Sequence, residues 1–323
     1  MKFTPFKFQV PLAAGGISLM AFNYLQFAMP HVKGLIKFSD IPWDKLTTGQ
    51  TVLYAPLIGI MFVFTLIAFI STLILLKSIV QWRFKEKNEY DNFMSGPPTM
   101  AIGIFVPVAS MSMLANVFLA PVGFFLSIVS SNVQQMMFPA LIYFGVLWVV
   151  LFMLEFKFLK NWLTKPLDST KLNFIWLIDV FAFGLVNLTG TGIASMSTNE
   201  EISSIAAFAS LVALSIGVFL LVAKLGYLLY LQIRSTSLPQ NPVLPSFFLM
   251  IPITCLFGIS FYRIALYLNT TFKLEIKVMS FFLINFSYVI AIGWGIFTVY
   301  LLSNYFKEYF YKSEFAAPQW AMV

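Results

Sequence analysis

Three charged side chains stand inside long apolar runs of the sequence: Asp179, Lys224 and Arg263. Such charges are costly in lipid, so they normally face protein or water and find an opposite charge. Asp179 and Lys224 belong to consecutive runs that turn near Glu200, and their similar depth favours a structural ion pair. Arg263 lies near the end of a later run, where it could reach the membrane interface or attract anions at a pore mouth.

Prolines and small residues form a second group of candidates, for the lining of a narrow pore. Pro107 and Pro252 each stand about nine residues into an apolar run, where a proline frees a carbonyl and kinks the helix. Their equal depth favours a shared internal layer, with simple packing kinks as the alternative. Gly16, Gly190 and Thr191 could line a pore because small residues permit close backbone approach, although tight helix packing explains them equally well.

The residue inventory argues against catalytic, metal and cofactor sites. One histidine (His31) and one cysteine (Cys255) leave no ligands for a histidine metal cage and no intrachain disulfide. No glycine-rich phosphate loop and no carboxylate–histidine constellation stands in or beside the apolar runs. His31, Asp40 and Asp44 share one loop, and we interpret them as a solvated surface. We therefore expect no enzyme and no cofactor, although a membrane-embedded enzyme is kept as an alternative.

The elements that position these residues are transmembrane helices. Hydrophobic residues make up 59% of the 323 positions and charged residues 10%, whereas soluble domains carry about 25% charged residues. A helix needs about 20 mostly apolar residues to cross the hydrocarbon core. Eight runs satisfy this requirement, at about 9–29, 52–80, 98–120, 134–158, 172–195, 203–232, 243–268 and 277–305. The predicted fold class is an all-α integral membrane protein.

The basic residues predict an orientation and not a nucleic-acid surface, because most lie in short loops between the apolar runs. With a cytoplasmic N-terminus and an uncleaved first helix, 13 of the 20 basic residues are cytoplasmic and five are external. The cytoplasmic set is Lys2, Lys7, Lys77, Arg83, Lys85, Lys87, Lys157, Lys160, Lys165, Lys171, Arg234, Lys307 and Lys312. The external set is Lys33, Lys37, Lys45, Lys273 and Lys277. We expect a multi-pass protein of the cell membrane.

The runs also repeat as pairs. The cytoplasmic entries to the odd-numbered runs fall near 98, 172, 243 and 314, about 71 to 74 residues apart. A constant spacing indicates a repeated helical hairpin. The sequence therefore predicts one transmembrane domain over 1–323, with four complete hairpins and a truncated fifth that begins near 314 as the start of a ninth helix. A short re-entrant or interfacial tail anchored by Trp320 is the alternative.

Three stretches resemble the tellurite-resistance and C4-dicarboxylate transporter family, which includes the plant guard-cell slow anion channels. The segment 10–16 is similar to the family's Pro-x4-Gly entry, with Gly16 at the glycine that abuts the pore gate. The stretch 89–108 resembles the approach to the third helix and its internal proline, and 250–255 resembles the seventh helix. One departure is the stretch 176–179, where the family usually has a proline.

The resemblance implies ten helices in five hairpins, with odd helices around a central pore and even helices outside. It also implies homotrimers in which each protomer has its own pore. The family's gating phenylalanine lies on the ninth helix, beyond Trp320 in this alignment.

The function that the resemblance implies is movement of small anions through a central pore. Chloride, nitrate, sulfite, malate and tellurite derivatives all stay open as substrates. A proton-coupled carrier, with Asp179 as its titratable group, and a non-catalytic membrane subunit of a larger complex are the alternatives.

Overall fold

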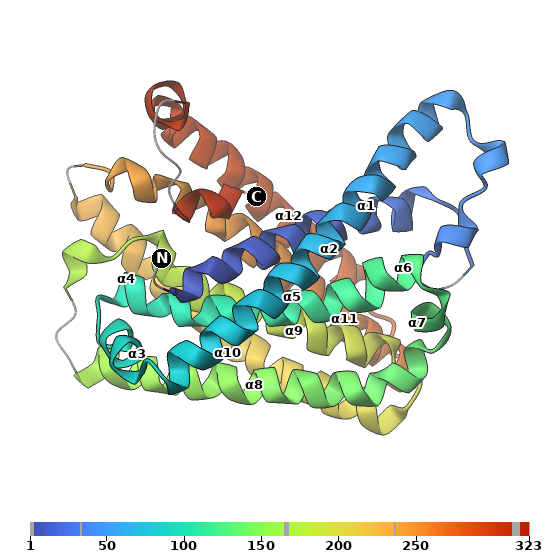
Figure 1. Ribbon diagram of the computed structural model, residues 1–323, viewed down its shortest axis with the longest axis horizontal. Helices are drawn as coiled ribbons and strands as arrows, with labels where there is room; N and C mark the ends of the chain where they lie inside the picture. Colours follow the sequence, from blue (N-terminus) through green and yellow to red (C-terminus); the bar gives the residue numbers. More distant parts are fainter. Residues whose placement is uncertain (1–2, 33, 165–167, 236, 312–316, 323) are drawn as a thin grey trace.

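The computed structural model describes residues 3–32, 34–164, 168–235, 237–311 and 317–322. Within these ranges every regular element is a helix (Figure 1). Four of the basic residues named above, Lys2, Lys33, Lys165 and Lys312, lie outside the described residues, as does the expected start of a fifth hairpin near 314.

Most of the long helices run back and forth along the long axis of the molecule, with α2 and α12 inclined to it, and short helices lie at both ends of the bundle (Figure 1). The long helices are α1 (Gln9–Ala28), α2 (Thr48–Phe84), α5 (Phe105–Val117), α8 (Val133–Thr164), α9 (Ile178–Met196), α10 (Glu200–Arg234), α11 (Met250–Phe272) and α12 (Lys277–Leu301). The short α-helices are α3 (Lys87–Met94), α4 (Pro98–Ala101), α6 (Gly123–Phe125) and α7 (Ser127–Ser131). The short 3-10 helices are η1 (Pro5–Phe8), η2 (Phe38–Asp40), η3 (Trp43–Lys45), η4 (Ile102–Ile104), η6 (Ser169–Lys171), η7 (Phe174–Leu177), η8 (Asn241–Leu249) and η10 (Ala317–Met322). Two π-helical segments are η5 (Phe118–Val122) and η9 (Tyr305–Phe310).

Seven helical segments in the described part of the chain are long and apolar enough to span a membrane, so the predicted fold class is confirmed. The expected count of eight is not reached, because the first run, α1, falls short on composition. Its 20 residues include Gln9, Asn23 and Gln26 and a pair of glycines, which lower its mean hydropathy.

Burial separates an inner from an outer layer. In the most apolar window of each span, 89% of Phe174–Met196 is buried, and 61% of both Pro98–Phe125 and Asn241–Phe272. The corresponding shares are 28% for α2 and α8, 39% for α10 and 11% for α12. An outer helix that is apolar yet exposed in this chain faces lipid or another protein. The third, fifth and seventh runs therefore form inner spans. We group α1 with them because it packs against α5.

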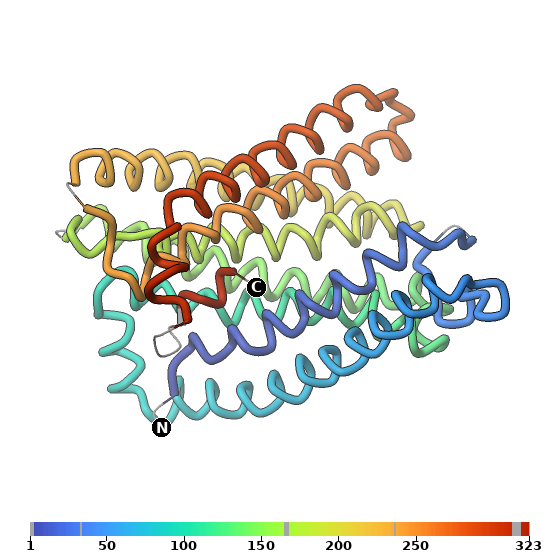
Figure 2. Tube along the Cα trace, turned by 90° about the horizontal axis from the view of Figure 1, so that it is seen from above, coloured from blue at the N-terminus to red at the C-terminus, as the bar shows by residue number. Residues whose placement is uncertain are grey.

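The inner helices contact each other in chain order. α1 packs against α5, α5 against α9, and α9 against α11. The two helices of each hairpin also pack against each other: α2 on α1, α8 on α5, α10 on α9 and α12 on α11. Seen from above, the α1–α2 and α11–α12 hairpins lie on opposite sides of the bundle, and η10 lies between them (Figure 2).

Equivalent positions of the sequence repeat contact each other where the neighbouring inner helices α5 and α9 pack together. The Ser112 hydroxyl donates to the Leu185 carbonyl at 2.7 Å, across a separation of 73 residues. Asn116 Nδ2 donates to Thr189 Oγ1 at 2.8 Å, again 73 residues away. A separation close to one repeat means that equivalent turns of α5 and α9 lie side by side.

Each inner helix is entered through a 3-10 turn: η1 leads into α1, η4 into α5, η7 into α9 and η8 into α11. Pro11, Pro107 and Pro252 are each the third residue of the α-helix that follows. A proline in the first turn has no N–H to lose from the helical ladder. The kinks expected in mid-helix at Pro107 and Pro252 are therefore changes of winding at the start of each α-helical segment.

Candidate functional site

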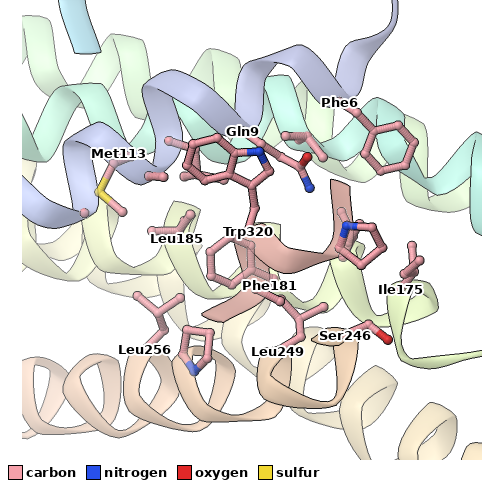
Figure 3. A pocket seen from close by; sticks show the side chains of 18 of the residues that line it. Phe6, Gln9, Met113, Ile175, Phe181, Leu185, Ser246, Leu249, Leu256 and Trp320 are labelled. Atoms are coloured by element: carbon pink, nitrogen blue, oxygen red, sulfur yellow. The ribbon is translucent and has the colours of Figure 1, made fainter. Parts of the chain in front are cut away.

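All four inner helices contribute to one central pocket of about 560 Å³. Figure 3 shows side chains from these helices converging on it. The lining residues are Phe6, Gln9, Leu12, Ala13, Gly16, Thr99, Met100, Val106, Met113, Asn173, Ile175, Ile178, Phe181, Leu185, Val243, Ser246, Leu249, Pro252, Cys255, Leu256, Ile259, Pro318, Trp320 and Ala321. We call this space the central pocket.

The lining of the central pocket is predominantly apolar. Its polar members are few and neutral: Gln9, Thr99, Asn173, Ser246 and Cys255. None of the described residues that line it is a lysine, arginine, histidine, aspartate or glutamate. Within the described chain, no three His, Cys, Asp or Glu side chains come together as metal ligands. The described lining is therefore neutral.

The C-terminal segment η10 contributes the largest side chain in the central pocket. Its Trp320 indole points among Gln9, Phe181 and Leu185 in the close view (Figure 3). The segment packs against η8, which begins the entry to α11. Trp320 therefore narrows the central pocket on the side that lies between α1 and α11.

A second, more polar space adjoins the central pocket at the end where the N-terminus lies. It has a volume of about 760 Å³ and shares Thr99, Met100, Asn173 and Val243 with the central pocket. We call it the vestibule. Its described lining includes the cations Lys171 and Arg234 and several serines and threonines, and none of these described residues is a carboxylate. Lys171 pairs with Asp168 at 3.0 Å, so Arg234 gives the vestibule most of its positive character.

The predicted pore-lining residues divide into two groups. Gly16 and Pro252 line the central pocket, whereas Pro107 is buried beside the lining residue Val106. Thr191 is buried, and its hydroxyl donates to the carbonyl of Asn187 in its own helix at 2.7 Å.

Gly190 faces the outer layer instead of the central pocket. A Cβ at this position would lie 2.5 Å from the Phe144 ring of α8 and would collide with Ser210 Oγ of α10. The glycine therefore allows α8 and α10 to approach α9, which is the packing role that small residues have in membrane helices.

Asp179 and Lys224 form a buried ion pair between α9 and α10. Lys224 Nζ also donates to the Trp176 carbonyl at 3.1 Å and lies 4.0 Å from the centroid of the Trp162 ring. Asp179 Oδ1 accepts from the Val180 amide at 2.7 Å. Neither charged residue lines the central pocket, although Ile178 and Phe181, on either side of Asp179, do.

A third ionisable side chain, which the sequence analysis missed, lies beside this pair. Glu155 of α8 is completely buried and interacts with both Asp179 and Lys224. Glu155 could have been noticed as the single acid within the apolar run 134–158. Because Lys157 and Lys160 follow it closely, its position resembles the polar end of a membrane helix.

Arg263 of α11 reaches across to α9. Its Nη1 donates to the Leu188 carbonyl at 2.7 Å. The guanidinium also lies against Gly192, where an added Cβ would come to 3.1 Å from Nη1. Two other polar residues, Asn187 of α9 and Ser260 of α11, are buried without a hydrogen-bond partner in the described structure.

Comparison with known proteins gives one match. The family model described as voltage-dependent anion channel matches residues 2–323, whereas no curated protein and no solved structure matches the chain significantly. This is the family of channels and transporters that the motifs at Gly16, Pro107 and Pro252 resemble. Because the match extends over nearly the whole sequence, the chain belongs to the voltage-dependent anion channel family.

Proposed function

We propose that this protein conducts small anions passively across the cell membrane, through the vestibule and the central pocket in series. The observation that carries the proposal is that all four inner helices contribute side chains to one pocket. A space enclosed by helices that run along the bundle axis is the arrangement a pore needs.

The charges of the pathway favour anions over cations. The vestibule presents Arg234 and Lys171, and none of the described residues that line either space is a carboxylate. A positive entrance raises the local concentration of anions, and a described lining without acids does not repel them. The apolar walls beyond the vestibule would limit conduction by excluding water.

The placement of the ion pair supports a channel over a proton-coupled carrier. A carrier needs a titratable group in the pathway, and Asp179 is instead paired with Lys224 outside the central pocket. Transport in liposomes with and without a pH gradient separates the two. A channel gives the same flux in both cases, and dependence on the gradient would favour the carrier.

The family and the distribution of charge also support proposals for the oligomeric state, the orientation and the substrates. We propose homotrimers with one pore per protomer, a cytoplasmic N-terminus, and chloride, nitrate, sulfite, C4-dicarboxylates or tellurite-derived anions as substrates. The excess of basic residues in the loops at the N-terminal end supports this orientation. The exposed apolar face of α12, 11% buried in its most apolar window, is available to lipid or to a neighbouring protomer.

Gly16 provides the direct test of the pathway. Only Met113 Cε comes within 4 Å of a Cβ built there, at 4.0 Å, so Gly16→Leu is accommodated and its side chain fills part of the central pocket. We expect chloride efflux from liposomes to fall by about tenfold or more. Gly59→Leu is the matched control, since Gly59 is exposed on α2 with nothing within 4 Å. Equal chloride efflux in the two variants would contradict the proposed pathway.

A further inference from the structure

The two cations that the sequence analysis singled out inside the apolar runs, Lys224 and Arg263, are neutralised differently. Lys224 has Asp179 as its ion-pair partner. Arg263 has no carboxylate partner within the described structure, and its one hydrogen bond goes to the neutral Leu188 carbonyl. Arg263 is half-buried. A cation that is partly withdrawn from water without a counter-charge is costly, so it normally coordinates an anion or keeps contact with solvent.

Arg263 stands on the helix face that lines the central pocket. Pro252, Cys255, Leu256 and Ile259 of α11 line the pocket, and Arg263 follows Ile259 by four residues, which is one helical turn. A long side chain on a helix leans toward the helix N-terminus. For Arg263 this direction leads back toward the pocket.

The partner helix places the guanidinium at the same level. Leu185 is the last residue of α9 that lines the pocket, and the guanidinium touches α9 at Leu188 and Gly192, one to two turns further on. The guanidinium therefore lies just beyond the end of the pocket that is opposite the vestibule. Only one of its five N–H groups has a protein acceptor in the described chain.

We propose that Arg263 forms a binding site for a small monovalent anion at this end of the pathway. The proposal rests on the pathway described above and adds a specific site to it. The anion supplies the missing counter-charge and accepts hydrogen bonds from the N–H groups that Leu188 does not occupy. The Leu188 carbonyl and the bare backbone of Gly192 position the guanidinium, since a side chain at 192 would displace it.

The rival explanation is a purely structural clamp between α11 and α9 through the Leu188 carbonyl. A clamp stabilises the fold equally in any salt, whereas a binding site stabilises it in proportion to its occupancy by the anion. The melting temperature of the purified protein in detergent separates the two, measured as chloride replaces gluconate at constant ionic strength.

We expect the melting temperature of the wild-type chain to rise with chloride and to saturate. Arg263→Gln should lose this rise, and its chloride efflux from liposomes at low chloride should fall by about tenfold. Lys277→Gln is the control, because Lys277 is an exposed cation that begins α12 at the same end of the bundle. It should keep both the chloride-dependent rise and the efflux. An Arg263→Gln variant with an unchanged chloride midpoint would overturn the site.

Gly192→Ala covers the case in which Arg263→Gln does not fold. It keeps the positive charge and pushes Nη1 away from its position, so the chloride midpoint should rise severalfold. An unchanged midpoint would overturn the site. Chloride-dependent stabilisation that needs Arg263, without any efflux, would leave the site standing and refute the pathway. Efflux that is independent of Arg263, without chloride-dependent stabilisation, would refute the site alone.

Discussion

Lys224 donates a hydrogen bond to Asp179 across the contact between α10 and α9, and neither residue lines the central pocket. The pair lies between the inner and outer layers, among the rings of Trp162 and Trp176. Its role there is to hold the two layers together.

Breaking this pair from one side should be strongly destabilising. Asp179→Asn leaves the Lys224 ammonium buried without its counter-charge, and we expect a loss of about 3–5 kcal/mol in the free energy of unfolding. The double variant Asp179→Asn with Lys224→Met should recover most of that loss, because neither member of the pair is left buried without its partner. Chemical denaturation in detergent measures both. Additive losses in the double variant would show that the two residues are not coupled.

Glu155 should behave in the opposite way to Asp179. One carboxylate, that of Asp179, already balances Lys224. Glu155→Gln keeps the shape of the side chain and leaves the pair of Asp179 and Lys224 in place, so we expect a change within about 1 kcal/mol, or a gain in stability. The same denaturation assay applies. A loss as large as that of Asp179→Asn would mean that Glu155 is part of the ion pair.

Gly190 is predicted to be a packing residue. In Gly190→Ala the new Cβ would meet the Phe144 ring at 2.5 Å and collide with Ser210, so α8 and α10 would have to move away from α9. We expect a cost of about 1–3 kcal/mol in unfolding free energy. Gly226→Ala of α10 is the matched control, because nothing lies within 4 Å of its Cβ position, and it should be neutral or gain up to about 1 kcal/mol.

Removal of the Trp320 side chain should open the pathway. The indole points into the central pocket beside Gln9 and Phe181, and Trp320→Ala would leave its volume empty (Figure 3). If the pocket conducts, chloride efflux should rise severalfold, and an anion larger than chloride should become permeant. Unchanged efflux of both anions would place the limiting constriction elsewhere. Trp43→Ala, in the loop at the opposite end of the bundle, is the control for loss of a tryptophan.

The sequence predicted the class of fold and the repeated hairpins because these depend on composition and on a regular spacing, whereas the inner position of the odd-numbered helices came from the family resemblance. Apolar runs of sufficient length must cross lipid, and entries about 71 to 74 residues apart imply equivalent helices. Asp179 and Lys224 could be placed at one level from residue counts alone, because two helices that turn near Glu200 run back along each other.

The rotation of each helix about its axis could not be predicted in the same way. Gly16 faces the central pocket and Gly190 faces the outer layer, yet both are glycines in apolar runs. Which face of a helix points inward depends on its neighbours on both sides, and a helix that is apolar all round carries little periodic signal. Glu155 was missed for a related reason, since its depth depends on where α8 ends, which is nine residues beyond it.

The 3-10 winding of η8 has a geometric effect on the route into the pocket. At about 2.0 Å per residue its nine residues extend about 18 Å, whereas the same residues in an α-helix would extend about 13.5 Å. With three residues per turn, side chains three apart stand directly above one another. Val243, Ser246 and Leu249 therefore form a straight row, and all three line the central pocket. In an α-helix, side chains three residues apart would be rotated away from one another around the helix. The 3-10 winding therefore keeps these three side chains in line from the vestibule into the central pocket.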